Sequence, residues 1–379
     1  MTRLRYGIIG SGYMAKLHSL ALRNIGPLMF PQLPDIELVR MADIDHDAAI
    51  AGAKRWGWSE ASNDPVSVTR GDDIDVVIVI TPNDSHATYG IDALAHGKHL
   101  VCEKPLANTV AGALRLAEAA RKSDKVSMVN FVYRAWPGIE LARELIAAGE
   151  LGELIHFQGH FFQDYAADPA LGYSWRFDKG VAGGGAFADI GSHIMDIACA
   201  LMGPVRSISA RSRQLHGTRP VVGGQPYNVD DITVSLVEFQ NGAHGSVHAS
   251  WAATGHKTDI GFEVIGTRGS LSFNWERNNE LHFFSASDPQ RTGGFRRIML
   301  GGIHPGVDPF WHAQGQGIGY AEAFSINARR MVDAVTGKDP KVRPNVEEAL
   351  HIVQIVEAAY RAVDEKGWVP VPSTDAYAA

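Results

Sequence analysis

The chain has 379 residues, of which 45% are hydrophobic and 20% are charged, and its formal net charge is −7. This composition is typical of a folded chain of two or three domains, and the acidic balance without a basic run excludes nucleic acid and an anionic membrane as expected partners. No apolar stretch approaches the length that crosses a bilayer, and a glycine-rich turn stands where a secretion signal would lie, so we expect a cytoplasmic protein.

The first third of the chain alternates short apolar runs with segments of helical periodicity. The run at 75–80 (D-V-V-I-V-I) is apolar on both faces, as in a central strand of a parallel sheet. This order predicts a doubly wound parallel sheet of the Rossmann type over residues 1–133. The expected strands are 4–9, 37–42, 75–80, 98–102 and 125–131, and the expected helices are 13–24, 45–56, 85–96 and 109–123.

The pattern changes in the remainder, residues 134–379. A helix beginning at Pro137 is followed by strands that alternate apolar and polar residues, as in a sheet with one exposed face. The sequence therefore predicts an α+β domain with an open, mainly antiparallel sheet, and its last helices are candidates to pack back on the first domain. The expected strands are 205–216, 231–239, 243–250, 257–265, 270–273 and 281–284, the expected helices are 137–148, 185–201, 320–336 and 345–365, and 288–318 is expected to be loop.

The segment Y-G-I-I-G-S-G-Y-M-A joins the first expected strand to the first expected helix. It places Gly10, Gly12 and Ala15 in the pattern G-x-G-x-x-A. The first glycine permits a tight turn, the second lets the backbone approach a pyrophosphate, and the alanine allows close packing of helix on strand. The motif predicts a dinucleotide site, with a purely structural glycine turn as the alternative. The expected cofactor contacts here are Gly10, Ser11, Gly12, Tyr13 and Met14.

An acidic residue is expected at the end of the second strand, and Asp43 in V-R-M-A-D fits that position. It lies further along the chain than usual, because a proline-rich segment at 26–35 has the composition of an inserted loop. A carboxylate there accepts hydrogen bonds from the adenosine ribose and repels a 2′-phosphate. We therefore expect NAD, with NADP as the less favoured cofactor. The alternative for Asp43 is that it caps the following helix.

Polar residues also follow the expected strand at 75–80. Thr81, Pro82 and Asn83 would lie at the carboxyl edge of the sheet, where ligands bind in doubly wound folds. His86 falls in the first turn of the next helix and is either a cofactor contact or a surface histidine. We include these four residues among the candidates for cofactor binding.

Four segments occur in a fixed order: the glycine-rich start, T-P-N-x-x-H at 81–86, E-K-P at 103–105, and G-G-G-x-x-x-D-x-G-x-H at 183–193. Together they resemble the Gfo/Idh/MocA oxidoreductases, and the resemblance covers nearly the whole chain. It implies a nicotinamide-dependent enzyme that oxidises a secondary alcohol of a sugar or inositol, or reduces the matching ketone. It also implies a homodimer or homotetramer formed through the open sheet. The catalytic lysine, aspartate and histidine of the family would correspond to Lys104, Asp189 and His193.

The chemistry of these residues agrees with that role. A hydride leaves an alcohol carbon only as the hydroxyl proton is removed, so a base must lie within hydrogen-bond reach of the oxygen. Asp189 and His193 have i, i+4 spacing, which places both on one face of a helix. His193 suits the general base, Asp189 can orient the imidazole or the substrate, and the Lys104 ammonium can stabilise a developing alkoxide. Glu103 is a candidate to position the nicotinamide.

Sugar sites combine aromatic side chains with fixed polar groups. Residues of these types lie near the end of the last Rossmann strand, upstream of the expected helix at 185–201, and in an aromatic loop near residue 310. Core packing or a subunit contact is the alternative for each aromatic residue. The substrate candidates are Tyr133, Gln163, Trp175, Arg176 and His312.

Two other functions share this pattern of residues. An NAD-dependent glycosidase of the same fold would oxidise the sugar transiently, and a regulator would sense the nucleotide without catalysis. Asp189 and His193 could hold a metal ion only as a two-residue site, and no third ligand at a suitable spacing is evident, so no metal is expected. Some of the 40 glycines form three groups, around the first turn, around residues 180–191, and between 301 and 319. We assign the first two groups to a nucleotide and polyol cleft, and the third to a loop.

Overall fold

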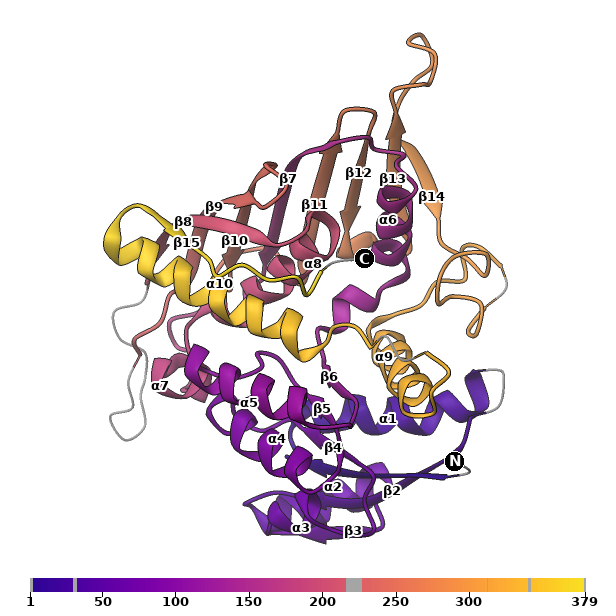
Figure 1. The fold of residues 1–379 in the computed structure, drawn as a ribbon, viewed down its shortest axis with the longest axis vertical. Coiled ribbons are helices and arrows are strands. Elements are labelled where there is room, and N and C mark those ends of the chain that lie inside the picture. Colours follow the sequence, from indigo (N-terminus) through magenta and orange to yellow (C-terminus); the bar gives the residue numbers. More distant parts are fainter. Residues whose placement is uncertain (1–2, 30–32, 216–226, 312, 340–341, 378–379) are drawn as a thin grey trace. The chain divides into compact units, whose positions relative to one another are not determined.

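The computed structural model describes residues 3–29, 33–215, 227–311, 313–339 and 342–377. The chain divides into two compact units, whose elements are labelled in Figure 1. Unit 1 comprises Met1–Ala135 and Ile318–Leu350, and unit 2 comprises Trp136–Gly317 and His351–Ala379. Residues 318–350 belong to unit 1 although they follow residues of unit 2 in the sequence.

Unit 1 is built on a six-stranded parallel sheet with the order β3-β2-β1-β4-β5-β6. This is the order of the doubly wound dinucleotide-binding fold, in which the strand order reverses between β1 and β4 while all strands stay parallel. All four residues of β4 are buried, as expected of a strand covered on both faces. The strands are β1 (Arg3–Ile9), β2 (Asp35–Ala42), β3 (Glu60–Ser62), β4 (Val76–Val79), β5 (His99–Cys102) and β6 (Ser127–Val129).

The helices of unit 1 begin and end where side chains and glycines satisfy the backbone. Asp45 caps α2 by accepting from the Ala48 amide, and Gly57 ends that helix in the left-handed conformation. Thr109 caps α5 in the same way as Asp45. The late helix α9 packs on α1, which explains why it belongs to this unit. The helices are α1 (Tyr13–Leu28), α2 (His46–Trp56), α3 (Val66–Thr69), α4 (His86–Ala95), α5 (Val110–Lys122) and α9 (Tyr320–Val335).

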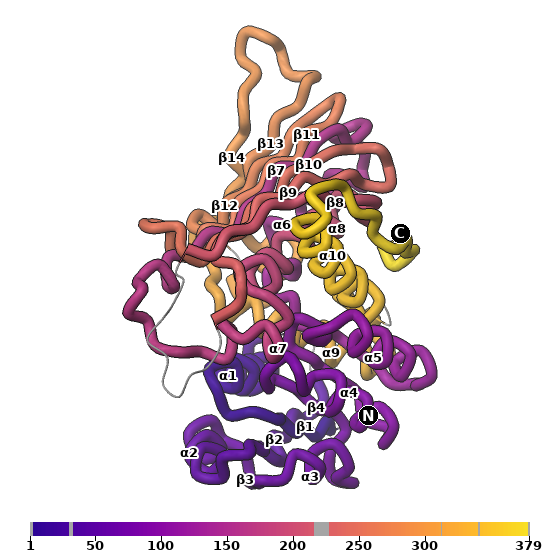
Figure 2. Tube along the Cα trace, turned by 90° about the vertical axis from the view of Figure 1, so that its left-hand side faces the viewer, coloured from indigo at the N-terminus to yellow at the C-terminus, as the bar shows by residue number. Residues whose placement is uncertain are grey.

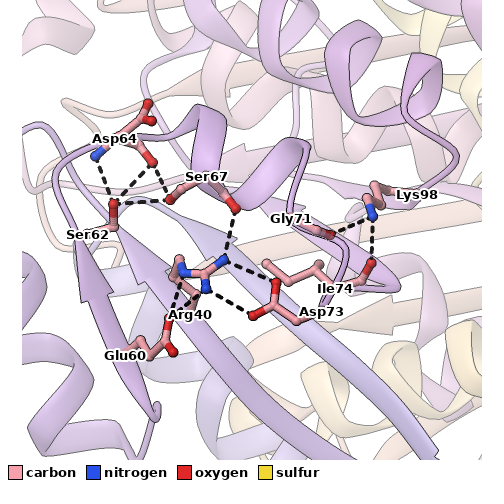
Figure 3. A network of polar contacts seen from close by, with 9 residues as sticks. All are labelled: Arg40, Glu60, Ser62, Asp64, Ser67, Gly71, Asp73, Ile74 and Lys98. Carbon is pink, nitrogen blue, oxygen red and sulfur yellow. Dashed lines mark hydrogen bonds and ion pairs between the residues drawn. The ribbon is translucent and has the colours of Figure 1, made fainter.

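Two basic side chains, Arg40 and Lys98, bind the segment that joins α3 to β4 (Figure 3). The Arg40 guanidinium on β2 donates to Glu60 at 2.6 Å and to Asp73 at 2.9 Å. The buried Lys98 ammonium donates to the carbonyl oxygens of Gly71 and Ile74. Arg40 thus ties the segment after α3 to β2, the strand that ends just before Asp43, and Lys98, which directly precedes β5, ties the same segment to that strand.

Unit 2 carries a nine-stranded sheet with the order β14-β13-β12-β11-β7-β10-β9-β8-β15. All pairs are antiparallel except β7 with β10, so the sheet is mixed. Apolar and polar residues alternate, which buries one face, while Val234 and Leu236 of β9 are 41% and 53% exposed. The strands are β7 (Leu154–Phe162), β8 (Val205–Arg213), β9 (Ile232–Phe239), β10 (His244–Ser250), β11 (Asp259–Gly266), β12 (Gly269–Asn274), β13 (Glu280–Ser285), β14 (Arg296–Met299) and β15 (Trp368–Pro370).

Helices α6 and α8 pack on the buried face of this sheet, and the loop between β13 and β14 extends beyond the other strands (Figure 2). The principal helices of unit 2 are α6 (Pro137–Ala147), α7 (Lys179–Ala182) and α8 (Ser192–Met202). The long helix α10 (Val346–Glu365) begins in unit 1 and continues in unit 2. Together the two sheets confirm the predicted fold class, a Rossmann sheet followed by a mainly antiparallel sheet.

Several elements differ from the sequence expectation. Helix α1 runs four residues beyond the expected end and includes Pro27, because a proline in the last turn removes only one backbone hydrogen bond. Part of the expected loop at 26–35 is therefore helical. The sequence did not predict β7, and the short β14 lies within the expected loop at 288–318. The short elements β3, α3 and β15 were not predicted either.

The helical segment Lys179–Met202 corrects one expectation about apolar length. Among the described residues, it alone is long and apolar enough to cross a membrane by length and composition. Within unit 2, however, 89% of its apolar window is buried, and α8 packs against β7. The composition of this segment is therefore accounted for by its place in the core.

Candidate active site

The glycine-rich turn between β1 and α1 has the geometry that its sequence predicts. Gly10 has a φ angle of 111°, in the left-handed region, and a Cβ there would lie 2.7 Å from the Ile80 side chain. Ala15 is fully buried against the sheet. A larger residue at either position would separate the helix from the strands, so this turn requires small residues for its own packing.

Gly12, by contrast, faces open space. A Cβ at this glycine would meet no atom within 4 Å. Gly12 is the N-cap of α1, yet no side chain caps the helix and its first turn contains no acidic residue. The Ala15 amide donates to the Gly12 carbonyl oxygen at 3.0 Å, which leaves the amides of Tyr13 and Met14 to an anion, and the residues fit a pyrophosphate at this helix N-terminus.

Asp43 lies directly after β2 and contacts the same turn. Its carboxylate accepts from the Ser11 amide at 2.8 Å and from the Ser11 hydroxyl at 2.7 Å. The other oxygen accepts from the Asp45 amide at 3.0 Å. The alternative that Asp43 caps α2 is wrong, because the cap of that helix is Asp45. Asp43 instead fixes Ser11 at the edge of the sheet where the sequence places the adenosine ribose.

His86 is buried, which excludes the surface-histidine alternative. Its Nδ1 lies 2.8 Å from the Pro105 carbonyl oxygen and its Nε2 lies 2.8 Å from the Thr81 carbonyl oxygen. Burial lowers the pKa of His86, although these two hydrogen bonds act in the opposite direction. His86 therefore ties the loop of Thr81, Pro82 and Asn83 to the turn that contains Lys104.

Glu103 lies beneath that turn and is 6% exposed. Its Oε1 is 2.8 Å from His18 Nε2 and accepts from Asn130 Nδ2 at 2.6 Å. Burial raises the pKa of the Glu103 carboxyl, but the hydrogen bonds from His18 and Asn130 outweigh burial and hold the pKa below its ordinary value. The other oxygen accepts from the Lys104 amide at 3.3 Å. Glu103 supports the backbone of Lys104, and its expected contact with the nicotinamide stays a prediction.

In unit 2, three consecutive glycines, Gly183 to Gly185, precede the segment that carries Asp189 and His193. Asp189 lies in a π-helical turn, η4 (Phe187–Gly191), and His193 is the second residue of α8. The sequence expected one regular α-helix; the wider turn shows that the segment is locally adapted, as π turns at functional sites often are. His193 is 7% exposed and its ring lies 6.1 Å from that of Phe161.

Three of the five substrate candidates, Gln163, Trp175 and Arg176, belong to unit 2 with this segment. Arg176 Nε is 3.8 Å from Asp189 Oδ2, and the Arg176 guanidinium lies 4.5 Å above the Trp175 ring. Gln163 follows β7, and its backbone bonds to Ser250 and Ala253. The structure thus brings Arg176 and Asp189 together.

The remaining two substrate candidates are Tyr133 and His312. Tyr133 is in unit 1, nearly buried, with its ring 5.7 Å from Tyr320. His312 lies outside the described residues. No group of three or more His, Cys, Asp or Glu side chains suited to a metal ion occurs in the described part of the chain.

Sequence reasoning missed Asp230, which contacts the start of the segment that carries Asp189. Its carboxylate oxygens accept from the Gly185 amide and the Phe187 amide, both at 3.0 Å. The only local signal is the pair of acidic residues, Asp230 and Asp231, just before an apolar strand. Because Asp230 lies 45 positions from Gly185 in the sequence, no spacing within a single motif could reveal the contact.

Each of the two units matches the model of a known protein family. Residues 4–131 match the model of an oxidoreductase family with an NAD-binding Rossmann fold, and residues 139–272 match the GFO/IDH/MocA C-terminal domain. The chain belongs to the Gfo/Idh/MocA oxidoreductase family. This confirms the resemblance drawn from the four sequence segments, and places the chain in a family of NAD-dependent dehydrogenases that act on sugars.

Two curated members of the family match almost the whole chain. Levoglucosan dehydrogenase of Pseudarthrobacter phenanthrenivorans is 36% identical over 99% of this chain and 100% of its own length. D-glucoside 3-dehydrogenase of Escherichia coli is 32% identical over 95% of each chain. A solved structure of levoglucosan dehydrogenase in complex with NADH and levoglucosan matches with a TM-score of 0.96 and 35% identity, over 98% of this chain and 100% of that one.

Proposed function

We propose that this protein is an NAD-dependent dehydrogenase that transfers a hydride between a secondary alcohol of a sugar or related polyol and the nicotinamide. The observation that carries the proposal is the match to a sugar dehydrogenase along the whole chain. Lys104, Asp189 and His193 are all present. The Lys104 amide donates to the Glu103 carboxylate, and the segment that carries Asp189 and His193 begins with two amides that donate to Asp230.

The cofactor side of the proposal rests on unit 1. The open face of Gly12 and the uncapped first turn of α1 suit the pyrophosphate, and Asp43 suits the adenosine ribose. A carboxylate at this position favours NAD over NADP, because it repels a 2′-phosphate. NAD, when bound, supplies the hydride acceptor. Ser11, Tyr13, Met14, Thr81, Pro82, Asn83 and His86 complete the residues that we assign to this site.

The reaction requires that the hydroxyl proton leave as the carbon gives up its hydride. We assign Lys104 to the reacting oxygen, where its ammonium stabilises the developing negative charge. His193 takes the proton, and Asp189 holds the imidazole or the substrate hydroxyl in place. Arg176, bound beside Asp189 and stacked on Trp175, provides donors for further hydroxyl groups. Gln163, Tyr133 and His312 stay predicted substrate contacts.

The substrate class follows from the relatives. One is named for levoglucosan and another for D-glucosides, and both match nearly the full length of this chain. We therefore propose a glucose-derived sugar with a free secondary hydroxyl as the first substrate to test, and the inositols as the second.

The test is substrate-dependent formation of NADH. Purified protein is mixed with levoglucosan, methyl glucosides or inositols and with NAD⁺ or NADP⁺, and the reduced nicotinamide is followed by absorbance. We expect activity with NAD⁺, and we expect Lys104→Ala to lower kcat by about 10²–10⁴-fold. Lys122→Ala, which changes an exposed lysine on α5 of the same unit, is the control and should keep wild-type kcat.

Other results would contradict parts of the proposal. Full activity of Lys104→Ala would exclude the assigned mechanism, and activity with NADP⁺ alone would exclude the assignment of Asp43. Cleavage of a glycoside without net NADH would identify the glycosidase reaction instead. Nucleotide binding with no turnover of any sugar would favour the regulator. The homo-oligomer and the cytoplasmic location stay predictions.

A further inference from the structure

The helical segment that carries Asp189 and His193 starts against a carboxylate from a distant part of the chain. Asp230 Oδ1 accepts from the Gly185 amide, and Asp230 Oδ2 accepts from the Phe187 amide. Between them, the Ala186 amide donates to the Asp230 backbone oxygen at 2.9 Å. Three consecutive amides at the start of the segment are thus satisfied by a single residue, which ordinary helix caps do not achieve.

The glycines of the motif make this contact possible. A Cβ on Gly185 would lie 2.6 Å from the Asp230 amide nitrogen and 2.7 Å from its Oδ1. A Cβ on Gly184 would lie 2.6 Å from a ring carbon of Tyr360. Neither glycine has a φ angle that demands glycine, so their small size, rather than their flexibility, is what the structure uses. These two glycines therefore admit protein side chains.

Tyr360 of α10 completes the arrangement. Its hydroxyl donates to Asp230 Oδ1 at 2.7 Å and accepts from the Gly185 amide at 3.0 Å. Thr233 donates its hydroxyl to Asp230 Oδ2 at 2.8 Å. Burial, and then the neighbouring Asp230, raise the pKa of Tyr360 well above its ordinary value, so the hydroxyl remains a donor. Asp230 is 7% exposed and both of its oxygens are held by donors.

We propose that Asp230 is a positioning residue for the reaction: it fixes the start of the segment on which Asp189 and His193 lie, two and six residues beyond Phe187. The inference rests on the proposed function for the roles of those two residues. A displacement of about 1 Å in a catalytic group can lower the rate 10²-fold, so a loose segment start would reduce kcat. The cofactor turn lies in unit 1 and should bind NAD⁺ as before.

The next residue in the chain provides a matched control. Asp231 is fully buried and also has several donors: the Trp251 indole at 2.8 Å, the Leu215 amide and the Tyr227 hydroxyl. None of these donors belongs to the segment 185–202. Asp231→Asn therefore removes a comparable buried carboxylate from the same loop and leaves the segment start intact.

The experiment compares Asp230→Asn, Asp231→Asn and Tyr360→Phe with the wild type. In Asp230→Asn, an amide NH₂ group must face a backbone N–H, so one bond to the segment is lost. We expect kcat to fall at least tenfold, the KM for NAD⁺ to change less than twofold, and the pH dependence of kcat to move. We expect Asp231→Asn to keep kcat within threefold, even if its melting temperature falls equally. Tyr360→Phe should lower kcat about threefold.

A second readout needs no turnover. The imidazole NMR signals of His193, assigned by their loss in His193→Gln, should shift in Asp230→Asn and remain in place in Asp231→Asn. If no sugar yields NADH with the wild type, the proposed function fails while this comparison still tests the anchor. Unchanged kcat and unmoved His193 signals in folded Asp230→Asn would overturn the inference, as would equal losses of kcat in both aspartate variants. If Asp230→Asn does not fold, an unmoved His193 signal and unchanged kcat in Tyr360→Phe would overturn it.

Discussion

The two glycine-rich starts of this molecule look alike in sequence and are used in opposite ways. In unit 1, Gly12 faces open space and α1 begins without a side-chain cap. In unit 2, Gly184 and Gly185 face Tyr360 and Asp230, which occupy the space and bind the first amides. A glycine before a helix can thus expose the helix end to a ligand or admit a protein carboxylate. The difference lies in whether a distant residue of the chain fills the space.

The comparison can be tested by one pair of substitutions, which should have the largest effects. Gly185→Ala places a methyl group against Asp230, and we expect the free energy of unfolding to fall by about 1–3 kcal/mol, because the core is overpacked there. Gly12→Ala meets no protein atom, so the free energy of unfolding should fall by no more than the roughly 0.5–1 kcal/mol that alanine costs at an N-cap. Its Kd for NAD⁺, however, should rise at least tenfold, because the methyl group occupies the approach to the first amides of α1. Urea unfolding and titration calorimetry measure the two quantities.

The same pair has a clear contrary outcome. If Gly12→Ala destabilised the fold as much as Gly185→Ala, both glycines would serve internal packing and the contrast would be lost. Gly26→Ala, in α1 and also facing open space, is a control that should leave the Kd for NAD⁺ unchanged and raise the free energy of unfolding by up to about 1 kcal/mol, because alanine favours a helix over glycine.

A pH experiment tests the contact that follows the C-terminal end of α8, where α10 again meets the chain. His351 on α10 is fully buried, and its Nε2 accepts from the Val205 amide at 3.2 Å. Burial lowers the pKa of His351 to about 4. Between pH 6.5 and 4 the unfolded chain therefore binds a proton that the native state does not, so the free energy of unfolding falls as the pH is lowered through this interval.

The free energy of unfolding should fall by an amount on the order of 1–3 kcal/mol over this pH interval. Urea unfolding at pH 7 and pH 4.5 measures it, and carboxylates elsewhere contribute equally to the wild type and to His351→Gln. The variant should therefore show a smaller difference between the two pH values. Equal differences in the two proteins would mean that His351 does not stay neutral in the native state.

The smallest expected effect concerns Asp43, the carboxylate beside the glycine-rich turn of unit 1. Asp43→Asn should reduce the preference for NAD⁺ over NADP⁺ about tenfold, since the repulsion of a 2′-phosphate is removed. The Ser11 contacts can be kept by the amide oxygen, and only the bond from the Asp45 amide is lost, so the free energy of unfolding should fall by about 1 kcal/mol. The ratio of kcat/KM for the two cofactors measures the change. An unchanged ratio would show that Asp43 acts on Ser11 alone.

Sequence reasoning succeeded where the determining residues are close together in the chain. The dinucleotide turn is specified between Gly10 and Ala15, and the buried strand β4 by four consecutive apolar residues. It failed at β7, where Gly159 interrupts the run of large residues on the buried face. It also failed at Asp230, because this residue lies in the connection from β8 to β9 and only folding brings it to Gly185. Local pattern predicted the elements, but not the residues that hold them in place.

Helix α10 bonds to both ends of the segment that carries Asp189 and His193. Tyr360 reaches its start at Gly185, and His351 reaches Val205, three residues after α8 ends. Both contacts come from one helix, so their separation is set by the spacing of nine positions between His351 and Tyr360 and cannot change freely. The stretch from 185 to 205 is therefore fixed in length: an inserted or deleted residue would break one contact, whereas the projecting loop between β13 and β14 can vary without that consequence.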